Sequence, residues 1–335
     1  MQIKVIGAGI YGCHLTLTLK ELGYRVELFE AKNKIFQGAS GNNQFRLHHG
    51  FHYPRNAVTR RQSKEGFRRF KDRYGEYCLP IAENLYSVVK DRSITDFETY
   101  KSVMASDSLE FQEHELKLLN TSLIEGTLNT KEEVLDLESL ARFFETQLDG
   151  VINLNHQFEL YEISNKQDLI IDCTWDASNQ KNESYFEPTI LLYYELLNPD
   201  LESWSQTLVD GNFWSLYRTS RKNRFTLSHV THSALENFQE IGKARYRLNS
   251  LTAKDVDYLR KCMESDVLEF FPSFFDHFKF EEPQLSIKTK KSSASANRAC
   301  EVEKNENIIS VRSGKLDTIF FAETEVLKIL GELNY

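Results

Sequence analysis

The sequence predicts an α/β protein in which a Rossmann-like dinucleotide-binding domain holds an inserted α+β domain built on an antiparallel sheet. The first observation is an apolar strand at residues 3–6 that runs directly into the glycine pattern of residues 7–12. The second is the return of the same strand pattern at residues 168–174 and 308–311. The third is a group of strand-like segments rich in β-branched and aromatic residues, at 185–197, 213–219 and 224–231.

The glycine pattern is typical of a phosphate-binding turn between a strand and a helix. Gly7 permits the tight turn, Gly9 lets the backbone approach a pyrophosphate, and Gly12 lets the helix pack closely on the sheet. The second strand ends in Glu30, about 20 residues after the glycines, where an acid hydrogen-bonds a ribose 2′-hydroxyl and repels a 2′-phosphate. The pattern therefore predicts an adenosine diphosphate ligand that lacks a 2′-phosphate.

Length, charge and hydropathy narrow the class of protein. At 335 residues the chain is long enough for two domains. Its net charge of −8 argues against a nucleic-acid partner, because phosphate binding needs Lys and Arg in excess. No apolar run approaches the ~20 residues that cross a bilayer, and Met1 enters the first strand directly, which leaves no room for a signal peptide. We expect a cytoplasmic protein without a membrane span.

The cysteines predict neither a disulfide framework nor a zinc site. They are odd in number, widely spaced, and free of CxxC or Cys-His metal spacing. They are Cys13, Cys78, Cys173, Cys262 and Cys300. We expect reduced thiols and no metal.

Local periodicity divides the chain between the two predicted domains. Residues 32–55 have no helical or strand period and are rich in Gly, Asn, His and Ser, so they are predicted to form a long functional loop. Periodic segments predict helices at 57–77, 134–147, 251–271 and 319–333, strands at 82–90 and 274–287, and a loop at 288–296. We assign residues 1–80, 150–180 and 297–335 to the dinucleotide-binding domain, and residues 81–149 and 181–296 to the inserted domain.

Five segments together resemble one known family over nearly the whole chain. They are GAGIYG at 7–12, Glu30, the loop GASGNNQFRLHHGFHYPR at 38–55, DLIIDCTW at 168–175 and SGKLDT at 313–318. In order and spacing the chain resembles the FAD-dependent D-amino-acid oxidase (DAO) superfamily, and LHHGFHYPR is similar to its 2-hydroxyglutarate dehydrogenase branch. The resemblance implies non-covalently bound FAD, a discontinuous FAD-binding domain of the GR2/DAO type, and a substrate domain on an antiparallel sheet.

The resemblance also implies which residues bind FAD. Those at the pyrophosphate would be Gly7, Ala8, Gly9, Ile10, Tyr11 and Gly12, with Glu30 and Ala31 at the adenosine ribose. Those along the phosphates and the flavin would be Ser40, Gly41, Asn42, Asn43, His48, His49, Gly50 and Thr174. The turn Ser313, Gly314, Lys315, Leu316, Asp317 and Thr318 would bring backbone N–H groups to the flavin N1 and C2 carbonyl.

Candidate catalytic residues follow from the chemistry of removing a hydride from a carbon that bears an amine or a hydroxyl. Such a reaction needs a base, and often a cation for a substrate carboxylate. His48, His49 and His52 are candidate bases, and His49 is the first choice because it precedes Gly50. Arginine is the best carboxylate partner, and of Arg46, Arg55, Arg218 and Arg298 we favour the last two.

Three functions remain open. The first is an FAD-dependent oxidoreductase that oxidises a C–N or C–O bond of a small polar substrate by hydride transfer to the flavin N5. The substrate would be an amino acid, amine, hydroxy acid or sugar derivative, and oxygen or another acceptor would take the electrons. The second is an NAD-dependent Rossmann dehydrogenase, and the third is a flavin-binding protein without catalytic activity. The sequence leaves the substrate, the acceptor and the oligomeric state undetermined.

Overall fold

The first domain is built on a mainly parallel sheet. The computed structural model describes residues 2–159, 168–175, 177, 184–291 and 300–333. Within these ranges a six-stranded sheet has the order β16 (Glu301–Asn305), β17 (Ile308–Arg312), β10 (Leu169–Asp172), β1 (Ile3–Ile6), β2 (Val26–Phe29) and β9 (Ile152–Asn153). Only the edge strand β16 pairs in antiparallel fashion. The predicted α/β fold with a Rossmann-like first domain is therefore confirmed.

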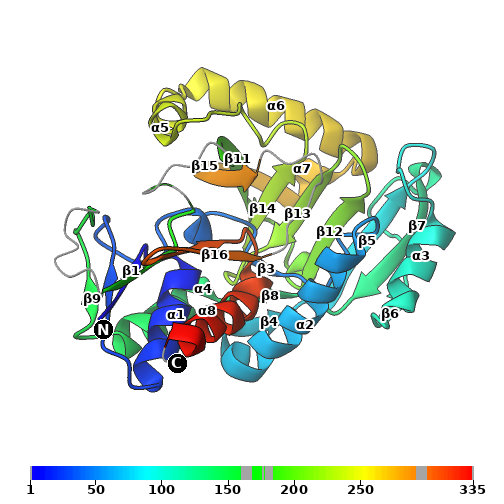
Figure 1. Ribbon diagram of the computed structural model, residues 1–335. Coiled ribbons are helices and arrows are strands. Elements are labelled where there is room, and N and C mark those ends of the chain that lie inside the picture. The colour runs from blue at the N-terminus through cyan, green and yellow to red at the C-terminus, as the bar shows by residue number, and fades with distance from the viewer. Residues whose placement is uncertain (1, 160–167, 176, 178–183, 292–299, 334–335) are drawn as a thin grey trace.

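Helices α1 (Ile10–Glu21), α4 (Leu137–Gln147) and α8 (Ile319–Leu333) lie together beside this sheet (Figure 1). Helix α1 is buried along most of its length because its apolar residues face the sheet on one side and the neighbouring helices on the other. Helix α2 (Ala57–Tyr74) adds Phe70 and Tyr74 to the same core and runs on toward the second domain. The core thus fixes the start of α1, where the glycine pattern lies.

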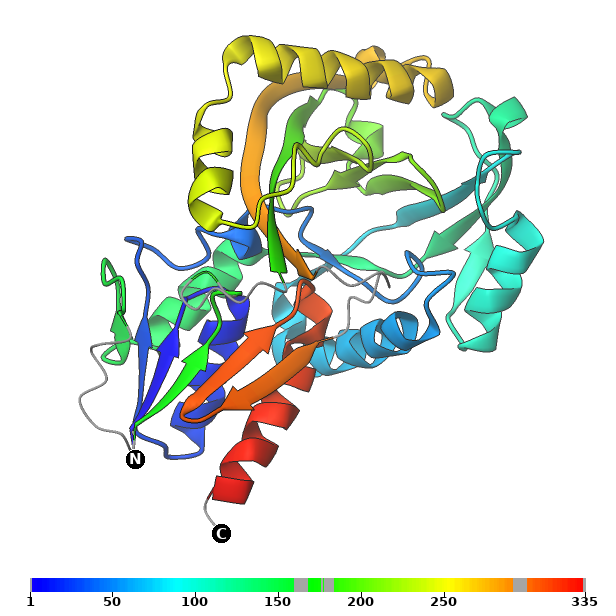
Figure 2. The same ribbon diagram turned by 45° about the horizontal axis from the view of Figure 1, so that its top comes forward.

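The second domain is built on an eight-stranded sheet. Its order is β15 (Phe278–Lys291), β11 (Ser184–Leu196), β14 (Arg224–His229), β13 (Trp214–Arg218), β12 (Trp204–Val209), β5 (Glu83–Val89), β7 (Ile124–Thr130) and β6 (Phe111–Glu113). Neighbouring strands are antiparallel except β5 and β12, which are parallel. Helices α5 (Ile241–Asn249), α6 (Ala253–Phe270) and α7 (Phe274–His277) lie on the side of this sheet away from α1 and α8 (Figure 2), and α3 (Phe97–Ser106) packs on β7.

The two faces of the eight-stranded sheet differ in chemistry. Apolar residues of one face pack against α6 in a core that includes Leu216, Leu227 and Met263. The opposite face is rich in buried hydroxyl and amide groups, because cross-strand partners share a face. These groups, called the polar face below, belong to the buried residues Tyr86, Thr207, Ser215, Tyr217, Thr226 and Gln284 and to the half-buried Tyr193.

A three-stranded sheet joins the domains and corrects the predicted boundary. It has the order β3 (Arg46–Leu47), β8 (Glu133–Leu135), β4 (Cys78–Pro80). We predicted that residues 81–149 belong to the inserted domain, yet Leu140 and Phe144 of α4 are buried in the core of the first domain. An amphipathic helix does not reveal from its own sequence which neighbour its apolar face will contact.

Two other local predictions were incomplete. Helices α3 and α5 were not predicted, and the loop predicted at 288–296 begins too early, because β15 continues to Lys291 alongside β11. The rest of that loop lies outside the residues that the structure describes. Pairing with a long neighbouring strand outweighs the weak strand preference of a lysine-rich segment.

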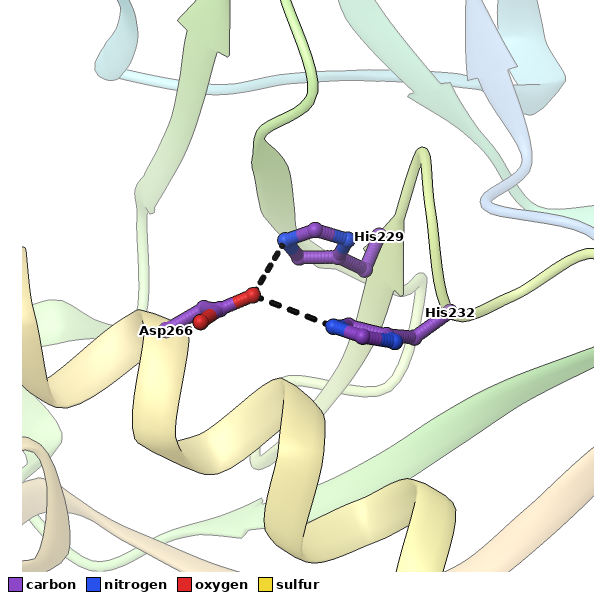
Figure 3. Close-up of side chains that lie close together, drawn as sticks. All are labelled: His229, His232 and Asp266. Carbon is purple, nitrogen blue, oxygen red and sulfur yellow. Dashed lines mark hydrogen bonds and ion pairs between the residues drawn. The ribbon is translucent and has the colours of Figure 1, made fainter.

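His229 and His232 connect the end of β14 to α6. Their Nε2 atoms lie 3.1 Å and 3.2 Å from Asp266 Oδ2 (Figure 3). The Thr231 N–H donates to His229 Nδ1, so the ring proton of His229 lies on Nε2, facing Asp266. Burial and the neighbouring His232 lower the pKa of His229 to about 4. Hydrogen bonding within the cluster accounts for this contact between β14 and α6.

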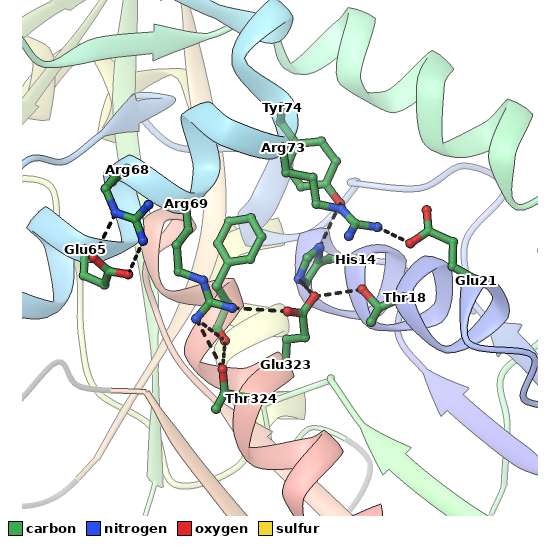
Figure 4. Close-up of polar contacts among 11 residues, drawn as sticks. His14, Thr18, Glu21, Glu65, Arg68, Arg69, Arg73, Tyr74, Glu323 and Thr324 are labelled. Carbon is green, nitrogen blue, oxygen red and sulfur yellow. Dashed lines mark hydrogen bonds and ion pairs between the residues drawn. The ribbon is translucent and has the colours of Figure 1, made fainter.

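A buried polar network joins α1, α2 and α8 (Figure 4). His14 Nδ1 lies 2.8 Å from the Tyr74 hydroxyl, and its Nε2 lies 3.0 Å from Glu323 Oε2. Thr18 donates to the same carboxylate at 2.9 Å, and Arg69 pairs with its other oxygen at 3.2 Å. One carboxylate of α8 therefore holds both other helices.

Replacing Glu323 by Gln should remove a pH-dependent part of the stability. Burial acts to raise the pKa of Glu323, but His14, Thr18 and Arg73 hold it at about 2, below its ordinary 4.5. Because the folded pKa lies below the unfolded one, the carboxylate stabilises the fold above pH ~5, and this contribution is lost as the pH falls toward ~2. At pH 7 the variant should lose about 3 kcal/mol of its free energy of unfolding.

Urea unfolding at pH 7 and pH 3 measures this effect. The difference in free energy of unfolding between the wild type and Glu323→Gln should be about half as large at pH 3 as at pH 7. Glu325→Gln is the control, because Glu325 is exposed on the same helix. Burial also lowers the pKa of His14 and Glu323 opposes this shift, so the variant should have a still lower His14 pKa than the wild type. A deficit of the same size at both pH values would contradict the assignment to Glu323.

Candidate active site at the domain junction

The glycine turn leaves the start of α1 open to an anion. Gly9 is the N-cap of α1, it has no side chain to cap the helix, and no acidic residue lies in the first turn. The helix therefore directs partial positive charge outward. An added Cβ at Gly12 would lie 2.0 Å from the Gly7 carbonyl oxygen, so only glycine fits there. These features fit the pyrophosphate of a dinucleotide.

Two side chains complete the walls of this turn. Ser40 Oγ accepts the Ile10 N–H at 3.0 Å, which places the predicted loop beside the start of α1. Thr174 follows β10, and its Cγ2 would lie 3.2 Å from a Cβ at Gly7. Segments from three parts of the chain thus meet at the carboxyl ends of parallel strands, where such folds bind ligands.

Glu30 stands at the end of β2, as the ribose assignment requires. Its carboxylate accepts the N–H groups of Ala8 at 2.8 Å and Lys32 at 2.9 Å. Ala31, beside it, is exposed. The carboxylate adjoins the glycine turn and has acceptor capacity left for a ribose hydroxyl.

We expect Glu30→Gln to weaken FAD binding by about 1 to 3 kcal/mol, because the charged acceptor for the ribose is lost. Fluorescence titration of the flavin-free protein with FAD measures the change. Glu27→Gln, on the same strand, should bind FAD like the wild type. Equal affinity of the Glu30 and Glu27 variants would remove Glu30 from the FAD site.

The turn after β17 is joined to the glycine turn. The Tyr11 hydroxyl donates to the Lys315 carbonyl oxygen and lies 2.7 Å from Thr318 Oγ1. Ser313 Oγ lies 2.6 Å from the same hydroxyl of Thr318. The two glycine-containing turns, predicted to bind one extended cofactor, therefore lie side by side.

The same turn also packs on α2 and on the histidine-rich loop. Lys315 Nζ lies 3.2 Å from the centre of the Tyr53 ring, and Leu316–Thr318 forms a 3₁₀ turn against α2. Asp317 is fully buried, and in the described structure neither of its carboxylate oxygens has a hydrogen-bond partner. Such an orphaned carboxylate in this turn fits a site built for a further polar group.

The remaining predicted loop residues hold the shape of the loop. Asn42 donates to the Gly38 carbonyl oxygen, and Asn43 donates to those of Ala39 and Ser40. An added Cβ at Gly41 would lie 1.8 Å from the Phe36 carbonyl oxygen. Gly50 has φ +121°, and a Cβ there would lie 3.1 Å from the Arg60 carbonyl oxygen.

The three histidines face different surroundings. The His49 ring stacks on Phe67 of α2, with the ring centres 4.4 Å apart. The His48 ring lies between the rings of His52 and Tyr53, at 5.6 Å and 5.5 Å. Burial lowers the pKa of His48 despite the opposing effect of Glu132, so its imidazole is neutral at pH 7. The structure places His48 in a polar cluster, whereas our first choice, His49, packs against a helix.

Glu132, between β7 and β8, is the centre of that cluster. Its Oε1 accepts the His49 N–H at 2.7 Å and lies 3.8 Å from His48 Nδ1. Its Oε2 accepts the Tyr86 hydroxyl, which in turn accepts an Arg46 N–H at 2.7 Å. Burial acts to raise the pKa of Glu132, but these neighbours hold it at about 2. We call Arg46, His48, Tyr86 and Glu132 the Glu132 cluster.

Arg46 is a buried cation that reaches the Glu132 carboxylate only through the Tyr86 hydroxyl. Its guanidinium donates to Ser215 Oγ at 2.5 Å and lies 3.9 Å from the centre of the Tyr217 ring. The side chain is 4% exposed, and in the part of the chain that the structure describes no carboxylate oxygen lies within 4.0 Å of it. Its Nε is buried without a hydrogen-bond partner among the described residues, so this N–H can still donate to an anion.

Of the two preferred arginines, Arg218 does not reach this cluster. Arg218 lies on the opposite face of β13 from Ser215 and Tyr217, and it donates to the carbonyl oxygens of Thr219 at 3.3 Å and Pro80 at 3.5 Å. Arg298 lies outside the described residues. Sequence reasoning missed Glu132 and Tyr86, because nothing local distinguishes Glu132 from the adjacent Glu133.

The helices and the cysteines bear on two of the predictions. No helix among the described residues has both the length and the apolar character to span a bilayer. All five cysteines are free thiols, and burial raises the pKa of Cys78 and Cys300 to about 12. These two thiols are therefore protonated and unreactive at neutral pH.

Comparison with known proteins identifies the family. Residues 2–151 match the family described as FAD dependent oxidoreductase (DAO). The chain is 36% identical to the FAD-dependent monooxygenase FPY4 of Fusarium mangiferae, covering 99% of this chain and 91% of that protein. It is 24% identical to the FAD-dependent monooxygenase kojA of Aspergillus flavus, with 99% and 86% covered.

Among solved structures, L-α-glycerophosphate oxidase from Mycoplasma pneumoniae with FAD bound has a TM-score of 0.73. It covers 100% of this chain and 94% of that one at 14% identity, a likeness that shows the fold. The NAD-dependent alternative is thereby set aside. The chain belongs to the FAD-dependent oxidoreductase (DAO) family, as its motifs predicted, and FAD is its cofactor.

Proposed function

We propose that this FAD-dependent oxidoreductase oxidises a C–O or C–N bond of a small polar molecule, by removal of a hydride to the flavin N5 and of a proton to His48. The observation that carries the proposal is the Glu132 cluster. It sets a neutral imidazole and a buried cation between the polar face and the turn after β17. A hydroxy acid is the substrate class that we favour.

His48 favours a C–O bond over a C–N bond. When bound, FAD supplies the acceptor for a hydride. An alcohol keeps its proton in neutral water, so its oxidation requires a base within the site, whereas an amine can lose a proton before it binds. The neutral His48 provides such a base.

Arg46 favours a substrate that carries a carboxylate or a phosphate. The unpaired Nε–H of Arg46 and the Ser215 hydroxyl beside it would hold an anionic group. We propose Arg46 for the role that the sequence assigned to Arg218 and Arg298. The five free thiols fit a reducing compartment such as the cytoplasm, which cell fractionation tests.

A monooxygenase is the second candidate, because two relatives carry that name. The two functions differ in what reduces the flavin. An oxidase or dehydrogenase takes both electrons from its substrate. A monooxygenase flavin takes them from an outside reductant such as NADH or NADPH before it reacts with oxygen.

Anaerobic mixing of the FAD-loaded protein distinguishes the candidates. One series contains hydroxy acids, amino acids, amines and sugar acids, and a second contains NADH or NADPH alone. We expect bleaching of the flavin band by a hydroxy acid alone, with hydrogen peroxide formed on return to air if oxygen is the acceptor. Bleaching only by NADH or NADPH would favour the monooxygenase, and no bleaching in either series would favour a flavin protein without activity.

A further inference from the structure

Glu132 and His48 come from different parts of the chain and meet inside the protein. His48 follows β3, and Glu132 precedes β8, the strand that pairs with β3. Glu132 is fully buried, and the His48 side chain is 20% exposed. Register between two short strands therefore fixes the distance between the carboxylate and the imidazole.

The carboxylate of Glu132 is oriented from both sides. Its Oε2 accepts from Tyr86, which Arg46 holds in turn, so this oxygen is turned away from His48. Its Oε1 accepts the His49 N–H and faces His48 Nδ1. Buried carboxylates are ionised only where such donors surround them, and here they do.

His48 Nδ1 is the atom that the carboxylate can influence. In the described structure Nδ1 is buried without a hydrogen-bond partner, and Glu132 Oε1 is 3.8 Å away. A shift of about 1 Å would bring this contact to hydrogen-bond length. Catalytic hydrogen bonds are often longer without substrate and shorten when it binds.

We propose that Glu132 is a positioning residue that holds His48 with its proton on Nδ1 and its lone pair on Nε2. A neutral imidazole carries one proton, and an adjacent carboxylate favours the tautomer that donates to it. A charge-assisted hydrogen bond is strong enough to shift the ratio of the two tautomers by at least about tenfold. The lone pair of Nε2 is then available on the other side of the ring.

The proposal rests on the proposed function for the use of that lone pair. In the oxidation, the substrate O–H bond breaks and its proton joins His48 Nε2, while the C–H hydrogen leaves with both electrons to FAD. His48 becomes an imidazolium whose Nδ1–H faces the Glu132 carboxylate. No further oxidant or reductant enters this step.

Nitrogen NMR of the FAD-loaded protein tests the tautomer without any substrate. Protein labelled with ¹⁵N-histidine is measured at pH 8, and a His48→Gln variant assigns the His48 signals. We expect the wild-type proton on Nδ1. In Glu132→Gln we expect at least a tenfold loss of this preference and a lower pKa of His48, because a neighbouring negative charge is removed.

Glu133→Gln is the matched control, since Glu133 pairs with Lys71 at 2.8 Å and not with His48. It should leave tautomer and titration unchanged. A wild-type proton on Nε2, which needs no variant to observe, would overturn the proposal. So would a Glu132→Gln variant whose His48 signals match those of the wild type.

Kinetics then separate this proposal from the proposed function. With a substrate from the anaerobic screen, Glu132→Gln should slow flavin reduction at least tenfold at unchanged flavin content, with KM little changed. Its activity should also persist to lower pH than that of the wild type, following the lower pKa of His48. If no compound reduces the flavin, the proposed function fails, while the NMR result still decides the role of Glu132.

Discussion

A Gly66→Ala variant should fold poorly and lose its flavin. Gly66 lies in α2 where the helix meets the turn Leu316–Thr318, and an added Cβ would lie 1.8 Å from the Asp317 carbonyl oxygen. Because that atom is backbone, either the helix or the turn must move. The cost should be at least the ~1 to 3 kcal/mol typical of overpacking. Urea unfolding and the flavin content of the purified protein measure both effects.

Gly331→Ala is the control for this variant. Gly331 lies in α8 with no atom within 4 Å of an added Cβ, so alanine should stabilise the helix by about 0.5 to 1 kcal/mol. Its flavin content should equal that of the wild type. If both variants retained full flavin, the close approach of α2 to the turn would not matter for the cofactor.

Loss of His48 should produce the largest loss of activity. His48→Ala should slow anaerobic flavin reduction by a substrate from the screen by ~100-fold or more, the scale of a positioned base. Because the base acts in its neutral form, the wild-type rate should fall as the pH drops through the pKa of His48, which burial places below 6.5. Stopped-flow absorbance between pH 5 and pH 8 measures both.

His49→Ala tests the choice between the two neighbours. The His49 ring stacks on Phe67, so its loss should affect packing more than the reduction rate. If flavin reduction were slow in His49→Ala and normal in His48→Ala, His49 would be the base, as the sequence suggested.

The sequence predicted most of the first domain because its signals are local. A strand, a glycine turn, a helix and Glu30 lie within thirty consecutive residues, and their roles depend on spacing alone. The hairpin of β13 and β14 was predicted for the same reason, since a short polar turn joins two apolar segments.

The Glu132 cluster was not predicted, because it depends on long-range pairing. Adjacent residues such as His48 and His49 point to different neighbours, and only the pairing of β3 with β8 decides which one meets Glu132. Arg46 was one of four candidates, and the choice between it and Arg218 depends on which face of the eight-stranded sheet meets the loop.

The contact of Tyr11 with Lys315 and Thr318 has a consequence for biosynthesis. These partners are about three hundred residues apart in sequence, and β1 borders β10, which in turn borders β17. On the ribosome, the apolar helix α1 therefore emerges long before the strands and helix that cover it. Because these contacts form late, folding is slow, and the apolar surface of α1 stays exposed to chaperones and to aggregation until they form. Yield in a heterologous host should thus depend on growth temperature and on the supply of riboflavin during synthesis.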